Sequence, residues 1–141
     1  MLSALELPWF LVFPPASFGV LTTTGRRTGK TRRRCVRAIR SGDRVYLVAI
    51  GGRHSGWLKN ALANPEVRLR IRGGTFVGVI RELRDEAERA EAEQAYCGEV
   101  HLAEYAECLV HRRGLPSRAK VTALHREWFE GGTPLVFEPR R

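Results

Sequence analysis

The clearest signal along the chain is a series of short apolar or β-branched runs separated by turn residues. Residues 67–71 and 75–83 alternate apolar and polar side chains, as strands with one buried face do. Ser41-Gly42-Asp43 and Gly73-Gly74 are turn signals that predict hairpins between neighbouring runs. The predicted strands span residues 18–24, 32–40, 44–50, 67–71, 75–83 and 133–139.

Other stretches have a helical composition. Ser55 is a suitable N-cap for a short helix over residues 56–63, which Asn64-Pro65 would end. Residues 85–112 are rich in Glu and Ala and favour one helix, or two helices broken near Gly98. Residues 113–132 are less periodic and are punctuated by Pro116 and by Gly131-Gly132, so no separate helix is assigned to them.

Five or six strands in mainly hairpin order, with helices at the side, predict an α+β fold that is mainly β: a small barrel with flanking helices. The length of 141 residues suits one domain with a real core. We divide it into an N-terminal strap (1–16), a barrel (17–83), a helical part (84–132) and a closing strand (133–139).

The N-terminal strap is apolar over residues 5–15 but is interrupted by prolines and lacks a basic leading segment. It therefore resembles neither a signal peptide nor a membrane span. We expect it to pack on the core; covering a pocket and peripheral contact with a membrane surface are the alternatives.

Charge and cysteine content narrow the class of protein. The sequence has 24 Lys and Arg against 15 Asp and Glu, a formal net charge of +9. This excess predicts an anionic partner: a nucleotide, a polyanionic cofactor, a nucleic acid or an acidic lipid. The cysteines at 35, 97 and 108 form no even disulfide framework, which favours a reducing, cytoplasmic location.

One turn concentrates the positive charge. Gly25 and Gly29 allow close backbone approach, while Arg26, Arg27 and Lys30 supply charge-assisted donors, joined by Arg32 just beyond. A phosphate or carboxylate ligand suits this chemistry. A hairpin whose arginines are merely solvated is the alternative.

Three blocks of the chain match a known pattern. Residues 22–32 read TTTGRRTGKTR, which resembles the TTTGR(K/R)(S/T)GxxR signature of the deazaflavin-dependent nitroreductase family, whose members use coenzyme F-420. Residues 133–139 resemble the family's closing PVVVLEP strand. A second internal block is similar to its VAxxGG…WxxNLxANP pattern, through Val48, Ala49, Gly51, Gly52, Trp57, Asn60, Ala63, Asn64 and Pro65.

The resemblance implies a split β-barrel shared with flavin-binding oxidoreductases, and hydride transfer from reduced F-420 to a quinone, enone or nitroaromatic. It also implies the positions that bind the coenzyme. At its phospholactate and glutamate tail these would be Arg26, Arg27, Thr28, Gly29, Arg32 and Arg33. Beside the deazaflavin ring and at the helix start they would be Val48, Ala49, Ile50, Gly51, Gly52, Gly56, Trp57, Leu58 and Asn60.

The catalytic side of the site is less defined. Many relatives carry a serine-lysine pair before the two glycines, where this chain has Ile50. No catalytic residue is assigned: the proton would come from solvent or a tyrosine, for which Tyr96 and Tyr105 are candidates. Trp57 has core packing as its alternative role.

Other functions remain as alternatives. The same fold could bind FMN, and a basic non-enzymatic module could bind nucleic acid or an anionic membrane. Cys97 with His101 and Cys108 with His111 have helical metal-ligand spacing, but the two pairs lie too far apart for one ion, and we expect no metal. Triad, HExxH and P-loop patterns are absent. We expect a small-molecule electron acceptor, no nucleic acid, and a monomer or homodimer.

Overall fold

The computed structural model describes residues 17–98 and 117–140, which form a seven-stranded antiparallel sheet, three α-helices and a short 3-10 helix. The strands are β1 (Phe18–Thr24), β2 (Thr31–Arg37), β3 (Ile39–Ser41), β4 (Arg44–Ala49), β5 (Glu66–Ile71), β6 (Gly74–Glu82) and β7 (Thr133–Pro139). The helices are η2 (Gly52–His54), α2 (Gly56–Ala63), α3 (Glu86–Gly98) and α5 (Arg118–Gly131).

The sheet is curled, because its two outermost strands are consecutive in the chain. The strand order is β2-β1-β5-β6-β7-β4-β3, and only Ala38 separates β2 from β3. The two edges of the sheet therefore meet at Ala38, whose N–H donates to the carbonyl of Ser17 at 2.8 Å. The prediction of one strand over residues 32–40 is wrong: it is divided at Ala38, where the chain turns the corner of the barrel and changes its pairing partner from β1 to β4.

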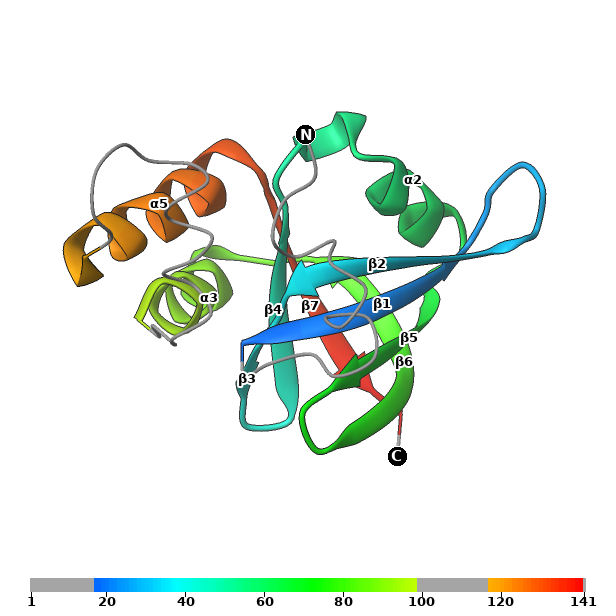
Figure 1. The fold of residues 1–141 in the computed structure, drawn as a ribbon, viewed down its shortest axis with the longest axis horizontal. Helices are drawn as coiled ribbons and strands as arrows, with labels where there is room; N and C mark the ends of the chain where they lie inside the picture. The colour runs from blue at the N-terminus through cyan, green and yellow to red at the C-terminus, as the bar shows by residue number, and fades with distance from the viewer. Residues whose placement is uncertain (1–16, 99–116, 141) are drawn as a thin grey trace.

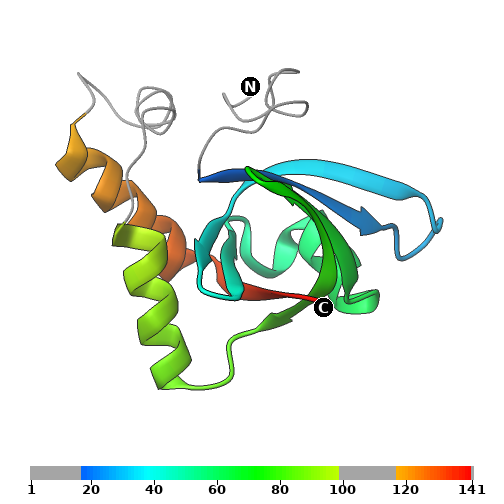
Figure 2. The same ribbon diagram turned by 90° about the horizontal axis from the view of Figure 1, so that it is seen from below.

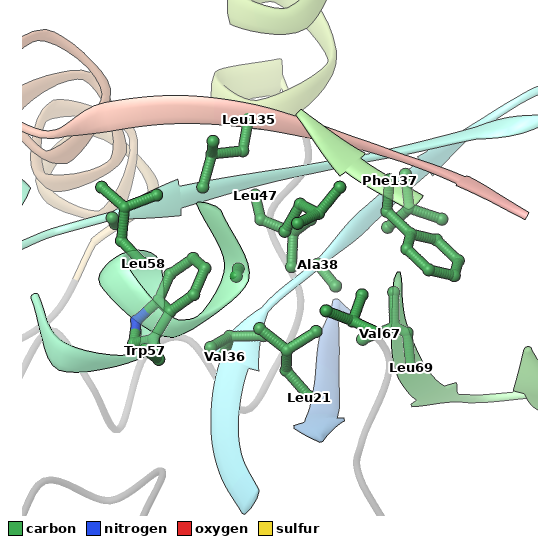
Figure 3. Close-up of a cluster of buried hydrophobic side chains, with 14 residues drawn as sticks. Leu21, Val36, Ala38, Leu47, Trp57, Leu58, Val67, Leu69, Leu135 and Phe137 are labelled. Carbon is green, nitrogen blue, oxygen red and sulfur yellow. The ribbon is translucent and has the colours of Figure 1, made fainter. Parts of the chain in front are cut away.

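The two faces of the sheet bury different clusters. Along β4, Val45 and Leu47 face the interior of the curl, whereas Tyr46 and Val48 face outward, as the period of two in a strand requires. The interior cluster is completed by α2, whose Trp57 and Leu58 point toward the side chains of the strands (Figure 3).

The outward cluster lies under α3 and α5, which sit together beside β3 and β4 (Figures 1 and 2). α5 lies within the helical part expected at residues 84–132, although the sequence pattern gave it no bounds of its own. Its buried positions follow the helical i, i+3, i+4 pattern, with the polar His125 among them; they are Val121, Leu124, His125, Trp128 and Phe129. Ser117 caps its start by accepting from the N–H of Lys120 at 3.2 Å.

The expected α+β, mainly β barrel with flanking helices is confirmed, with seven strands instead of five or six. β1, α2 and β7 have the predicted bounds. The strap at 1–16 and the predicted helix beyond Gly98 lie outside the described residues. In the part of the chain that is described, every helix is too short or too polar to cross a bilayer.

Candidate functional site

The turn between β1 and β2, residues 25–30, is a compact loop that we call the basic loop. Gly25 N–H donates to the carbonyl of Lys30 at 2.7 Å, and Gly29 N–H to the carbonyl of Gly25 at 2.9 Å. A Cβ on Gly25 would lie 3.0 Å from Thr28 Oγ1 and 3.1 Å from the carbonyl oxygen of Lys30, so a larger residue would require the loop to shift slightly. Gly29 has a φ of +70°, which favours glycine. The glycines are thus required by the shape of the turn.

Four cations project from this turn and from the start of β2: Arg27, Lys30, Arg32 and Arg33. All are exposed, and none is paired with a carboxylate of another described residue. The surrounding sequence offers little compensation, because Asp43 is the one acid between positions 17 and 65. The loop therefore presents uncompensated positive charge to an external anion.

The strand register divides these cations between two faces. Arg32 lies opposite Thr23 and Arg33 opposite Thr22 on β1, so their side chains project to opposite sides of the hairpin. Arg32 shares the side of Leu21, which faces the barrel interior and α2. Arg32, rather than Arg33, is therefore on the same side as the helix that the sequence also placed in the site.

The basic loop is attached to α2. Asn60 Oδ1 accepts from Arg26 Nη1 at 2.8 Å and from the backbone N–H of Arg26 at 3.3 Å. Asn64 Nδ2 reaches the carbonyl of Thr24 at 3.5 Å. These contacts join positions more than 30 residues apart, and no sequence pattern identifies Asn60 as the partner of Arg26. The resemblance placed both residues at the coenzyme; the structure brings them together.

The start of α2 is open and has free donors. Ser55 makes no side-chain cap hydrogen bond, and the first turn carries no acidic residue. A Cβ on Gly56 would meet nothing within 4 Å, and one on Gly51 would meet nothing nearer than 3.8 Å. Backbone N–H groups at an uncapped helix start attract anions. Asn60 lies about one helical turn, roughly 5.4 Å, further along the axis, so the contact between the basic loop and α2 is about one turn from this start.

The residues at the end of β4 that were expected to lie beside the deazaflavin ring differ in their exposure. Ile50 is 47% exposed, and Gly51 and Gly52 form the adjoining loop. Val48, by contrast, packs outward against the helical layer, and Ala49 is fully buried. Of these residues, the exposed Ile50 side chain and the backbone at Gly51 and Gly52 can therefore face a ligand at this end of β4.

Trp57 and Leu58 belong to the interior cluster (Figure 3). Trp57 is 9% exposed, so most of its indole is core, which was the alternative role considered for it. Little of this side chain is therefore left to contact a coenzyme ring.

Tyr96, a candidate proton donor, lies elsewhere. It is 1% exposed in the outward cluster, with the Arg37 guanidinium 4.3 Å from its ring centre. Arg37 also donates to the carbonyl of Tyr96 near the C-terminal end of α3, which suits the negative end of the helix dipole. The sheet separates Tyr96 from α2 and the basic loop. Tyr105 lies outside the described residues.

The helical side has its own charged groups, and they are paired. Glu88, buried on α3, accepts from Arg81 at 2.7 and 2.9 Å and from the backbone N–H of Arg84 at 2.8 Å. The hydrogen bonds from Arg81 hold the pKa of Glu88 down at about 2 against the opposing effect of burial. Arg44 adds a longer contact to Glu88 at 3.4 Å. This group fixes α3 to β4 and β6.

Buried titratable groups beside it are shifted toward their neutral forms. Burial, with a contribution from Arg37, lowers the pKa of His125 to about 3, and burial raises the pKa of the Cys97 thiol. Neither group is near the basic loop. Within residues 17–98 and 117–140, His, Cys, Asp and Glu side chains form no cluster of three or more suited to a metal ion. His101, Cys108 and His111 lie outside that part of the chain.

A family model described as F-420H(2)-dependent quinone reductase matches residues 12–111. That span covers well over half of the chain and includes the basic loop, the end of β4 and α2.

Solved structures with the same architecture support this match at the level of the fold. An F-420-H2 dependent reductase, FDR-A, has a TM-score of 0.57 and 21% identity over 87% of this chain and 95% of that one. The FAD binding protein from Mycobacterium smegmatis has a TM-score of 0.55 and 17% identity over 99% and 91%. A third match, described as a domain-swapped dimer, has a TM-score of 0.53 and 22% identity over 87% and 81%. The expected split-barrel fold is confirmed.

Proposed function

The chain belongs to the F-420H(2)-dependent quinone reductase family, an oxidoreductase family that uses coenzyme F-420, and from this premise we propose which acceptor and residues it uses. We propose that the acceptor is a quinone or a similar small electrophile, an enone or a nitroaromatic. The observation that supports the site is the basic loop, which is bonded to α2 at Asn60 and whose exposed cations have no carboxylate partner among the described residues.

The residues present fit the coenzyme on chemical grounds. An acidic tail needs several charged donors, and Arg27, Lys30 and Arg32, which pair with no carboxylate within residues 17–98 and 117–140, provide them at one end of the barrel. A flat ring needs an approach that no side chain blocks, and Gly51 and Gly56 leave this space open. The cations of the hairpin could therefore bind the acidic tail, while the unobstructed surface at Gly51 and Gly56 accommodates the ring.

We assign the chain's own residues to binding and orientation. Arg27, Lys30 and Arg32 would hold the acidic tail, with Thr28 and Gly29 shaping the loop and Arg33 on the other side of the hairpin. The uncapped N–H groups of Gly56, Trp57 and Leu58 would orient an anionic or carbonyl oxygen at the helix start. The backbone at residues 49–52 would support the ring. The coenzyme supplies the hydride when bound, so the protein needs no strong acid or base of its own.

The proton that accompanies hydride transfer is assigned to solvent. Tyr96 is buried in the outward cluster and makes its contacts with Arg37, far from the opening at α2. The exposed position of Ile50 at the strand end leaves the same opening accessible to water.

Coenzyme titration tests the assignment directly. Oxidised F-420 added to the purified protein should change in fluorescence with micromolar or tighter affinity, whereas FMN should bind more weakly. Reduced F-420 should then be consumed when a soluble short-chain quinone is added under anaerobic conditions. Binding of FMN in preference to F-420, or binding of neither, would contradict the proposal. Nucleic acid provides a further control, since a nucleic-acid module would bind it with a steep dependence on salt.

We also propose a homodimer, supported by the domain-swapped dimer among the structures of this fold. Sedimentation velocity should give about twice the mass of one 15.9 kDa chain. A single species at the mass of one chain would contradict this.

A further inference from the structure

We propose that Asn60 is a positioning residue, which acts by fixing Arg26 and therefore the whole basic loop against α2. This inference rests on the proposed function, because it concerns how the loop meets an anionic coenzyme. Asn60 would act through its side-chain oxygen and not through charge. Arg26 would hold the loop in place, while Arg27, Lys30 and Arg32 make the ionic contacts.

Asn60 holds both the backbone and the side chain of Arg26. Its Oδ1 accepts two N–H groups of the same residue, Arg26, one from the guanidinium at 2.8 Å and one from the backbone at 3.3 Å. An amide oxygen has two lone pairs, so this atom is fully used. The backbone contact fixes the position of the chain at residue 26, and the guanidinium contact fixes the direction of its side chain.

Asn60 and Arg26 lie in different environments, one packed and one at the tip of a hairpin. Asn60 is largely buried, on the side of α2 that also buries Trp57 and Ala61 in the interior cluster. The anchor therefore stands on a packed part of the molecule. The loop that it holds lies at the tip of a hairpin that extends beyond the body of the barrel (Figure 1). Without an anchor, such a tip would sample many orientations.

Hydrogen bonds within the basic loop connect its residues to one another. Gly25 N–H, Gly29 N–H and Lys30 N–H all donate within the loop, to the carbonyl of Lys30, to the carbonyl of Gly25 and to Thr28 Oγ1. The loop thus moves as one unit, and holding residue 26 holds its neighbours. Ordering the loop before the coenzyme arrives removes part of the entropy lost on binding.

The substitution Asn60→Ala isolates this role because it removes the acceptor and leaves every positive charge in place. We expect faster hydrogen exchange at the amide of Arg26, whose N–H loses its acceptor, and F-420 affinity about tenfold weaker. The slope of log Kd against log salt should stay at the wild-type value, since the number of ionic contacts is unchanged. Arg27→Ala should give the opposite pattern: wild-type amide exchange in the loop, and a shallower salt slope.

Two further variants control the result. Gln94→Ala, which removes an exposed amide from α3, should leave loop exchange and affinity at wild-type values. Asn60→Asp keeps the oxygen acceptor and should restore wild-type amide exchange in the loop. Thermal melting of each variant reports whether the barrel remains folded.

The outcomes separate the inference from the proposed function. Wild-type exchange in Asn60→Ala overturns the positioning role, and so does an affinity equal to that of Gln94→Ala. If the wild-type protein binds no F-420, the proposed function fails. Amide exchange then tests by itself whether Asn60 holds the basic loop. Faster exchange in Asn60→Ala supports this positioning role, and unchanged exchange overturns it.

Discussion

Arginine has opposite roles on the two sides of the barrel. On the side of α3 and α5, Arg81 and Arg44 converge on the buried Glu88, and Arg37 is buried against Tyr96. At the basic loop, Arg27 and Arg32 are exposed and have no carboxylate partner among the described residues.

This difference separates charges that stabilise the fold from charges kept for a ligand. A buried carboxylate needs its partners, because loss of one partner leaves an uncompensated charge in a poorly solvated place. An exposed guanidinium is solvated by water and contributes little to the free energy of unfolding. Position, and not residue type, therefore predicts which arginines affect stability and which affect binding.

The largest expected effect is a loss of stability in acid, caused by the buried groups beside α3 and α5. The pKa of His125 is about 3, below its ordinary 6.5, and the pKa of Glu88 is about 2, below its ordinary 4.5. The unfolded chain therefore binds more protons than the folded one, first between pH 6.5 and 3 at His125 and then between pH 4.5 and 2 at Glu88. The free energy of unfolding, measured by urea titration, should fall steadily as the pH is lowered from 7 to 4.

The variant His125→Gln is the control for this pH dependence. It should flatten the decline between pH 6.5 and about 5.5, where the carboxylates of the unfolded chain remain largely ionised. An equally steep decline in that variant would show that the buried imidazole is not its source.

The substitution Glu88→Gln should have the next largest effect. It leaves Arg81 with a weaker partner in a partly buried place, and we expect the free energy of unfolding to drop by about 2–3 kcal/mol. Binding of F-420 to the folded protein should not change. Glu86→Gln, at an exposed position on the same helix, should cost less than about 1 kcal/mol. A weaker coenzyme affinity in Glu88→Gln would break the proposed separation.

The double substitution Arg27→Ala with Arg32→Ala should weaken coenzyme binding and leave stability almost unchanged, which is the reverse of the result expected for Glu88→Gln. Stability should change by less than about 0.5 kcal/mol, since both side chains are exposed and neither is paired with a carboxylate in the part of the chain that the structure describes. F-420 binding should weaken by about 2 kcal/mol, roughly 30-fold, for two exposed charged contacts. The matched control is Arg68→Ala with Arg70→Ala, which removes the same charge from exposed positions on β5. Equal losses in both double variants would mean that net charge, and not the loop, attracts the coenzyme.

Local sequence determined much of the fold. The bounds of β1 and β7 followed from short apolar and β-branched runs, and those of α2 from the Ser55 cap position and the Asn64-Pro65 stop, because these signals act over a few residues. The coenzyme family followed from the glycine-framed loop and the second block for the same reason: both are short ordered motifs. The sequence alone also set the uneven charge, with Asp43 the one acid between positions 17 and 65.

Tertiary structure decided what depends on contacts between distant residues. The break at Ala38 arises because the barrel closes there, and the helix α5 is recognisable once its face of Val121, Leu124 and Trp128 has a cluster to cover. Only the fold pairs Arg26 with Asn60 and places Tyr96 across the sheet from both. The sequence thus supplied the groups that can hold an anion, and the packing of α2 on the barrel determined which of them hold the loop and which remain free for the ligand.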